Sequence, residues 1–416
     1  MKFIFLIFFS LCFCNQLLFA TGEETHPEMT ISLLTTDPTT EKIYTAWGHT
    51  AVRVKIPTEE IDIVFNYGIF SFGNDFIYKF VKGETDFRLA AIHFESALAE
   101  VRDEKQVFLY EQTLNLTEAE KETLFTALLE NLKPENRYYR YSFFFDNCAT
   151  RPLWQIEKAV NGTIHYPMLN NTKTFRDLIY LKLADSPWYA FGIDLCLGSE
   201  TDRIVTDREL LFLPEEMMSS YAGSTIEAGD SIRPLVSHTE ILNYPPGVNT
   251  EKTASITGFL TPLTTGWLFF LLIVAHTLYY RYKNKNDLWL DVSLFSIYGL
   301  LGCLLFFLAF ISEHACTNPN YNLLWCNPFQ LIFAVLVLFR KLKKAMYCYQ
   351  IVNISLLAIS IVGWYFIPQH YNSAFLPFIL ALFIRSANYI FQSKKIVCYW
   401  KNKKNNNPLI NLDVIV

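Results

Sequence analysis

The sequence lacks the cysteine patterns that build a zinc site or a dense disulfide framework. Its nine cysteines include no Cys-x-x-Cys pair and no metal-ligand spacing, so we expect no metal and predict no cofactor. Between positions 21 and 250 only Cys148 and Cys196 occur. A disulfide between these two residues is one interpretation of Cys148, because exported proteins keep such bonds oxidised.

The chain also lacks the excess of positive charge that nucleic-acid binding requires. Its formal net charge is −5, and long basic runs are absent outside the C-terminal half. We therefore predict no nucleic-acid partner. The composition changes near position 255, after which apolar stretches dominate. The two halves of the chain are expected to lie in different solvents.

The N-terminal segment predicts export. Met1 and Lys2 precede an apolar segment, Phe3 to Leu18, and the small residue Ala20 follows it. This order is typical of a secretory signal. We assign residues 1–20 to a signal peptide or signal anchor, 21–250 to an exported domain, 251–404 to a transmembrane domain and 405–416 to a cytoplasmic tail.

Five apolar stretches in the C-terminal half are each near the length that crosses a bilayer. They are Leu263–Tyr279, Leu288–Ile311, Leu323–Phe339, Tyr347–Ile367 and Ala374–Ile390. The first and third loops between them are basic around Arg281 and Arg340, whereas the second and fourth contain no Lys or Arg. The positive-inside rule predicts a five-helix membrane domain with its tail in the cytoplasm and the exported domain on the opposite side.

The exported half begins with a predicted hairpin. Strands are expected at Met29–Leu34, Ala46–Val54 and Ile61–Phe70. If the turn between the last two strands is centred between Pro57 and Thr58, His49 faces Asn66 and Arg53 faces Asp62. A histidine thereby gains an amide neighbour.

The remaining elements of this half are predicted from capping and periodicity. We expect a loop with a short helix over Gly73–Leu89, a strand over Val101–Leu109, a helix after Thr117, a helix over Thr174–Ala184 and a linker over Ser237–Thr250. The helix after Thr117 starts with a capping box, because Glu120 follows three residues later. The polar residues between Trp188 and Leu213 are expected to brace loops.

Cys148 is predicted to lie at the start of a helix. Asp146 or Asn147 can cap the segment that continues through Leu153 and Ile156. Backbone N–H groups and the positive end of the helix dipole then favour the thiolate, which is the nucleophilic form of cysteine. The alternative is a small buried apolar residue.

A nucleophilic cysteine needs a base and a group that orients the base. We assign His49 as the base and Asn66 as the orienting residue, with His93 and His165 as rival bases. For the oxyanion, the backbone N–H of Cys148 is the natural donor, together with the Asn147 side chain.

Several motifs resemble the Lnb family of bacterial lipoprotein N-acyltransferases. They are Trp47 to Arg53, Asn66-Tyr67-Gly68, Lys82-Gly83-Glu84, Asp146 to Arg151 and Phe191 to Asp194. The resemblance implies an α+β, permuted papain-like exported domain followed by the five-helix membrane domain, anchored in the cytoplasmic membrane with its catalytic domain on the periplasmic side.

The resemblance also implies the chemistry. Cys148 would carry an acyl chain as a thioester, and the N-terminal amino group of a diacylglyceryl-modified lipoprotein would attack it. The expected partners are therefore lipoproteins, a lipid acyl donor and the membrane. Arg151 could meet an anionic group of a substrate or pair with Asp146, and Phe143 to Phe145 could line an acyl groove or belong to the core.

Two other functions fit the same sequence. One is a membrane-anchored thiol hydrolase that acts on cell-wall peptides through Cys148 and His49, because a fold does not separate hydrolase from transferase. The other is a non-enzymatic receptor with a Cys148–Cys196 disulfide. In the membrane half, Glu313, His314 and Asn322 either handle a lipid headgroup or are simply solvated, and Arg385 is expected to snorkel towards the cytoplasmic face.

Overall fold

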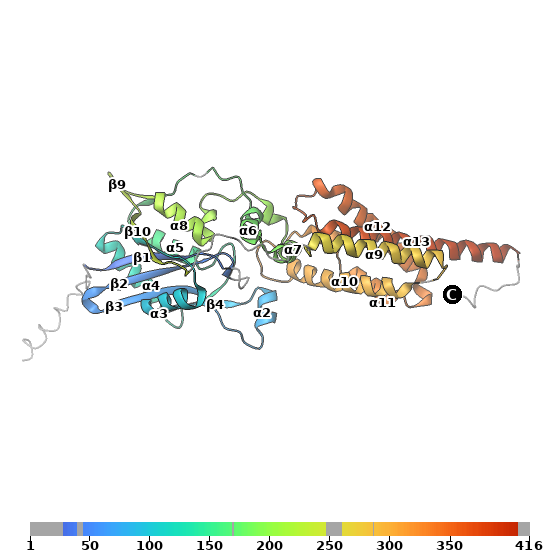
Figure 1. Cartoon of the computed structure of the whole chain (residues 1–416), viewed down its shortest axis with the longest axis horizontal. Coiled ribbons are helices and arrows are strands. Elements are labelled where there is room, and N and C mark those ends of the chain that lie inside the picture. Colours follow the sequence, from blue (N-terminus) through green and yellow to red (C-terminus); the bar gives the residue numbers. More distant parts are fainter. Residues whose placement is uncertain (1–27, 40–44, 169, 247–259, 286, 407–416) are drawn as a thin grey trace, which may run out of the picture.

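The computed structural model describes residues 28–39, 45–168, 170–246, 260–285 and 287–406, with side chains as far as Ser393. A sheet-rich N-terminal domain is followed by a helical C-terminal region (Figure 1). The predicted signal, the end of the predicted linker and most of the predicted tail lie outside the described residues.

The N-terminal domain is built on one seven-stranded antiparallel sheet. In spatial order its strands are β10 (Val236–Asn243), β5 (Leu109–Leu114), β1 (Thr30–Thr36), β2 (His49–Ile56), β3 (Ile61–Ile69), β4 (Asp86–His93) and β6 (Tyr138–Arg140). Alternate residues of the central strands enter different cores: Leu33 and Val52 face one core, and Leu34 and Ala51 face the other. The three predicted N-terminal strands are confirmed.

Helices cover both faces of this sheet. On one face lie α4 (Glu118–Leu132), α5 (Thr150–Ala159) and α8 (Pro214–Gly223), whose residues Leu124, Ile156 and Met217 share a core with the sheet. The other face is covered by α3 (Phe94–Ala99), whose Phe94 packs beside Leu34. The capping box predicted at Thr117 and Glu120 is present.

The predicted hairpin forms, but its register differs by two residues from the prediction. Lys55, and not Arg53, lies opposite Asp62. A shift of two residues keeps every side chain on its predicted face, because side chains alternate with a period of two. Arg53 therefore still reaches Asp62 diagonally, with its Nη2 atom 2.6 Å from Oδ2.

Three local predictions were wrong. Residues Glu100–Lys105 form a π-helix, and the strand begins only at Leu109. The short helix α2 (Phe76–Lys82) was expected, but β4 starts at Asp86, inside the predicted loop. The beginning of the predicted linker is strand β10, whose mostly exposed residues give no apolar alternation. The sequence also gave no signal for the small sheet of β7 (Thr163–His165), β8 (Thr225–Ala228) and β9 (Ser231–Pro234).

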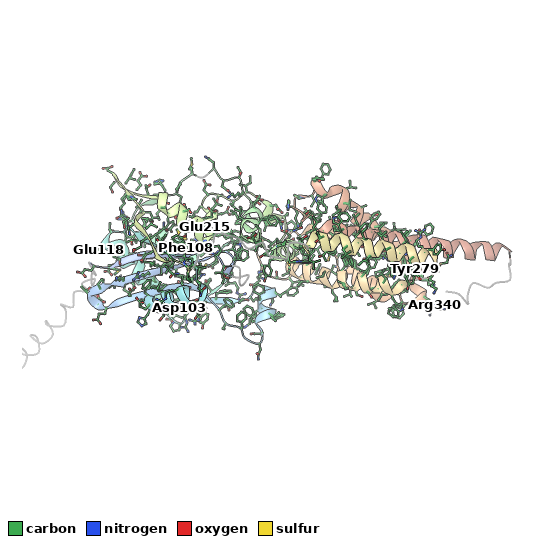
Figure 2. All side chains as sticks on the ribbon, viewed as in Figure 1. Asp103, Phe108, Glu118, Glu215, Tyr279 and Arg340 are labelled. Carbon is green, nitrogen blue, oxygen red and sulfur yellow. The ribbon has the colours of Figure 1, made fainter. Side chains whose placement is uncertain are left out.

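The C-terminal region makes this a multi-pass membrane protein. Among the described residues, four helices are long and apolar enough to cross a bilayer: α9 (Pro262–Tyr282), α10 (Leu288–Phe310), α12 (Lys343–Val362) and α13 (Phe375–Asn406). The third predicted span is the exception, since it contains only a 3-10 turn and the eight-residue helix α11 (Phe329–Leu336). Pro328 precedes α11 and has no N–H to extend a helix backwards. Arg340 lies at the end of this region that is far from the sheet domain (Figure 2).

Arg385 does not snorkel. It is completely buried, and it bonds to Asp291, Thr277 and Asp287 from α10, α9 and the residue that precedes α10. Two carboxylates within 2.7 Å of the guanidinium make burial of the charge tolerable, because an unpaired ion at this depth would be costly. The expectation of a snorkelling side chain was therefore wrong.

The two regions are joined at the end of helix α7 (Pro187–Cys196). Backbone carbonyls in the last turn of a helix have no partner within it. Here Asn322 donates to the carbonyls of Asp194 and Leu195, and Asn320 donates to those of Leu195 and Cys196. Loops between membrane helices thus supply the cap that the helix itself cannot make.

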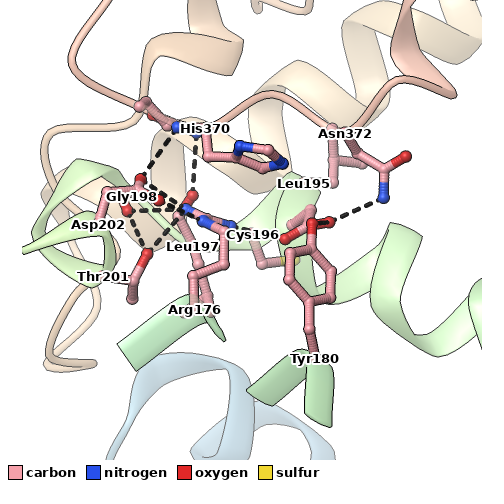
Figure 3. A network of polar contacts seen from close by, with 12 residues as sticks. Arg176, Tyr180, Leu195, Cys196, Leu197, Gly198, Thr201, Asp202, His370 and Asn372 are labelled. Carbon is pink, nitrogen blue, oxygen red and sulfur yellow. Dashed lines mark hydrogen bonds and ion pairs between the residues drawn. The ribbon is translucent and has the colours of Figure 1, made fainter. Parts of the chain in front are cut away.

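A buried arginine fixes the same junction (Figure 3). Arg176, on α6 (Phe175–Leu183), donates from Nη1 to Asp194 at 2.6 Å, from Nε to Asp202 at 2.7 Å, and from Nη2 to Thr201 at 2.7 Å. Asn372, from the loop before α13, donates to the second oxygen of Asp194. Asp194 and Asp202, which were expected only to brace loops, hold the sheet domain to the membrane region.

Candidate active site

Cys148 lies in the short turn that leads into α5. The helix begins at Thr150, two residues later than the predicted start. The Asn147 side-chain oxygen accepts hydrogen bonds from the N–H groups of Ala149 and Thr150, at 2.8 and 3.0 Å. Asn147 is therefore the capping residue, and it holds the partly exposed Cys148 beside the first turn of the helix.

His49 and Asn66 meet Cys148 from two neighbouring strands. His49 opens β2, and its Nε2 atom lies 2.7 Å from Oδ1 of Asn66 on β3. Because a carbonyl oxygen only accepts, Nε2 carries the hydrogen of this bond. The ring also hydrogen-bonds to Cys148, which leaves Nδ1 as the nitrogen that faces the thiol. The structure thus brings together the three residues that the sequence proposed.

Gly68 lies beside Cys148 and His49. It has a φ of +95°, a conformation that residues with side chains rarely adopt. The position that a Cβ would take lies 3.6 Å from Cβ of Cys148 and 3.8 Å from Cε1 of His49. Both distances are ordinary van der Waals contacts, so the backbone conformation, and not a lack of space, is what favours glycine beside the thiol and the imidazole.

The electrostatics favour a thiolate–imidazolium pair. Burial opposes ionisation of Cys148, but the charge and hydrogen bond of His49, with the backbone N–H groups of Thr50 and Cys148, lower its pKa below the ordinary value. Burial likewise opposes a charged His49, yet its charge interaction and hydrogen bond with Cys148 raise its pKa. Each ion stabilises the other, so the pair is charged over a wider pH range than either residue alone.

The two further site candidates from the sequence, Asn147 and Arg151, both have partners within the protein. The Asn147 amide nitrogen donates to the carbonyls of Phe143 and Phe212, so it has no hydrogen left for an oxyanion. Arg151 pairs with Asp146 through two bonds of 2.5 and 2.6 Å, and its guanidinium lies 4.1 Å from the centre of the Tyr139 ring. Of the two roles considered for Arg151, the structure favours pairing with Asp146.

Thr50 is the residue that sequence reasoning missed. Its backbone N–H, like that of Cys148 itself, helps to lower the pKa of the Cys148 thiol. The type of residue does not show whether its backbone N–H acts as a donor in a site. Only the strand position directly after His49 could have indicated it.

The rival residues lie elsewhere. His93 is exposed at the end of β4, and His165 is exposed on β7, where it pairs with Glu227. Cys148 and Cys196 are both free, so the predicted alternative of a disulfide between them is wrong. Burial raises the pKa of Cys196 to about 11.

Residues of the loop after α10 contact the rest of the protein, although Glu313 stays exposed. Glu313 pairs with Arg140 of β6, and His314 bonds to the carbonyl of Phe80 on α2. Asn322 is buried under α7. The loop thus makes a second contact between the two regions while Glu313 keeps its access to solvent.

The aromatic run before Cys148 belongs mainly to the core. Phe144 is buried against Phe175 and Phe212, and Phe143 packs at its edge. Phe145 is the exposed member of the run. Among the residues that the structure describes, no group of three or more His, Cys, Asp or Glu side chains is placed to hold a metal ion.

These features define a multi-pass membrane protein whose sheet domain carries a Cys–His–Asn cluster close to the membrane region. Residues 25–180 match the family model of the Lnb N-terminal periplasmic domain, and residues 253–396 match that of the Lnb transmembrane domain. The chain belongs to the Lnb family. No curated protein and no solved structure matches it.

Proposed function

We propose that this protein transfers an acyl chain, through a thioester on Cys148, to the N-terminal amino group of diacylglyceryl-modified lipoproteins. The observation that carries the proposal is the Cys148–His49–Asn66 cluster, with its 2.7 Å bond between His49 and Asn66. Its lowered cysteine pKa and raised histidine pKa suit a nucleophile and an acid–base group.

In the first step the thiolate attacks the carbonyl carbon of a lipid ester. The C–S bond forms, the ester C–O bond breaks, and protonated His49 gives its proton to the departing alkoxide. In the second step the lipoprotein amine attacks the thioester. The C–N bond forms, the C–S bond breaks, His49 takes a proton from the nitrogen, and the starting thiolate–imidazolium pair returns.

Both steps pass through a tetrahedral oxyanion, and backbone N–H groups are its natural donors. The N–H groups of Thr50 and Cys148 both lower the pKa of the thiol, so both act on negative charge at this position. We assign them the role of oxyanion donors, part of which we had expected of the Asn147 side chain.

The membrane region supports acyl transfer between lipids. Donor and acceptor both stay in the bilayer, so a nucleophile held beside the membrane avoids much of the cost of bringing them together. We propose a permuted papain-like fold for the sheet domain, over residues 21–250, and an inner-membrane location with this domain in the periplasm. The basic loops at the far end of the helical region support that orientation.

The test is the chemical state of lipoprotein N-termini. Mass spectrometry of lipoproteins from cells that carry the wild-type gene, no gene, or Cys148→Ser should show N-acylated cysteine only with the wild type. N-acylation that persists without the gene would refute the proposal. Release of peptide fragments from the cell wall, without N-acylation, would instead identify the thiol hydrolase.

A further inference from the structure

A ladder of aromatic rings runs from the neighbourhood of Cys148 to the membrane region. Its members are Tyr141, Phe87, Phe70, Phe76 and Phe80, followed by the His314 ring, with centroid separations of 4.1, 4.9, 5.6, 5.8 and 5.9 Å in that order. We call these five aromatic residues the aromatic ladder. The mechanism described above uses none of them.

The inner end of the aromatic ladder lies beside the nucleophile. Phe70 follows Gly68 by two residues, and a Cβ at Gly68 would lie 3.6 Å from Cβ of Cys148. Tyr141 stacks on Phe87, and after burial the charge of Cys148 is the largest influence that raises the pKa of Tyr141. An acyl chain attached to the sulfur would therefore start next to these rings.

The outer end of the aromatic ladder lies at the end of a membrane helix. Helix α10 ends at Phe310, and the next residues bond to α2: the Glu313 N–H donates to the Lys82 carbonyl at 2.8 Å, and Nε2 of His314 lies 2.6 Å from the Phe80 carbonyl. Gly83 permits this contact, because a Cβ there would lie 2.8 Å from the His314 nitrogen. Helix α2 is thus held at the level where α10 leaves the bilayer.

The surface of α2 and the preceding loop is unusually apolar for a segment in water. The exposed fractions are 72% for Phe72, 77% for Ile77 and 62% for Tyr78. Helix α10 contacts α2 and also exposes Phe306 and Phe310, whose ring centroids lie 4.9 Å apart. Contiguous exposed apolar surface marks an interaction site, and its contact with a membrane helix identifies lipid as the partner.

We propose that the aromatic ladder is the acyl-chain site and that α2 rests in the surface of the bilayer. A long acyl chain leaves the membrane over α2 and lies along the rings, which brings its carbonyl to Cys148. The occupant is thus the hydrocarbon chain of a membrane lipid. The catalytic part of this statement rests on the proposed function, whereas the lipid contact of α2 does not.

The first experiment measures how fast Cys148 is alkylated by two reagents, iodoacetamide and N-hexadecyl iodoacetamide, in the full-length protein in lipid nanodiscs. We expect a preference for the hexadecyl reagent that falls roughly tenfold in Phe76→Ser and in Phe80→Ser, because each change removes apolar contact with the chain. Ile232→Ser is the matched control, since Ile232 is 71% exposed on β9, far from the membrane region. An unchanged preference in both ladder variants would overturn the acyl-chain site and leave the thiol mechanism standing.

The second experiment needs no reactive thiol. Benzoylphenylalanine is placed at Ile77 in one protein and at Ile232 in another, and phospholipid adducts are counted after illumination in nanodiscs. We expect adducts at Ile77 and almost none at Ile232. Equal yields at the two positions would overturn the proposal, even if Cys148 proved unreactive to both alkylating reagents and the proposed function had failed.

Discussion

The sheet domain contains two polar clusters that differ in how completely their groups are bonded. Around Arg176, which is 1% exposed, all three guanidinium nitrogens donate to carboxylate, hydroxyl or carbonyl oxygens. Around Cys148, the imidazole is held by one amide, and its other nitrogen faces a sulfur that can gain or lose a proton. The cluster around Arg176, whose donors are all bonded, therefore stabilises the structure. The cluster around Cys148 has fewer bonds and keeps a proton that can move between the imidazole and the sulfur.

Both clusters join distant parts of the chain, and in both burial opposes the charged form of an ionisable group, so desolvation alone does not distinguish a site from a support. The two clusters differ in what keeps their groups charged. Arg176 has two carboxylate partners and stays charged at every accessible pH. Cys148 and His49 hold each other in the charged state, so their charge depends on both.

The largest expected effect is the loss of acyl transfer in Cys148→Ser. A serine hydroxyl beside His49 is far less acidic than a thiol, so the rate should fall at least roughly 10³-fold. Purified protein in nanodiscs, with a lipopeptide acceptor, gives the measurement. Cys196→Ser is the control and should keep its activity, and substantial turnover by Cys148→Ser would exclude a thioester.

Arg176→Met should affect stability more than any other single change in the junction. It leaves Asp194 buried without its cation, and breaking such a pair costs about 3 to 5 kcal/mol. Thermal unfolding in detergent measures the loss. The matched control is Arg203→Met, because the Arg203–Glu209 pair is partly exposed and should contribute only about 0 to 1 kcal/mol. Equal stability of the two variants would remove the contrast between the clusters.

Asn66→Ala should reduce the rate roughly tenfold to a hundredfold, less than loss of the nucleophile. The variant keeps both reacting groups but no longer fixes the tautomer and tilt of the His49 ring. Steady-state kinetics should show the loss in kcat, with little change in unfolding temperature. A fall in stability as large as that of Arg176→Met would mean that Asn66 is structural.

The smallest effect is a displacement in pH. Because the pKa of Cys148 is lowered, its thiolate persists below the ordinary range and disappears only as the pH falls through the lowered value. Cys148 should therefore react with iodoacetamide at mildly acidic pH, where Cys196, with a pKa of about 11, does not. In His49→Gln the profile should move up towards the ordinary thiol pKa of about 8.5. A profile that is the same with and without His49 would contradict the ion pair.

The sequence predicted which residues form the site better than it predicted how the strands pair. His49 and Asn66 come together because strand alternation keeps them on one face even when the register is two residues away. Strand β10 escaped prediction because its side chains are mostly exposed at the sheet edge. The donor at Thr50 is a backbone N–H, which every residue except proline has, so the residue type could not predict it.

The predicted span around Leu331 shows another limit. Hydropathy counts apolar residues, but it does not register that Pro328 and the polar Asn327 divide the stretch before α11. Arg385 was misjudged for a related reason. Its partners Asp287 and Asp291 lie about a hundred residues earlier, where no local pattern connects them to it.

The capped end of α7 also sets an order for the maturation of this protein. Asp194, Leu195 and Cys196 are synthesised before Asn320 and Asn322, which bond to their carbonyls from a loop more than a hundred residues later. Until α10 has entered the membrane and that loop has emerged on the same side as α7, the carbonyls can bond only to water. Folding of the sheet domain is therefore complete only after the membrane region has been inserted. A chain that ended after α9 would lack the hydrogen bonds that cap the end of α7.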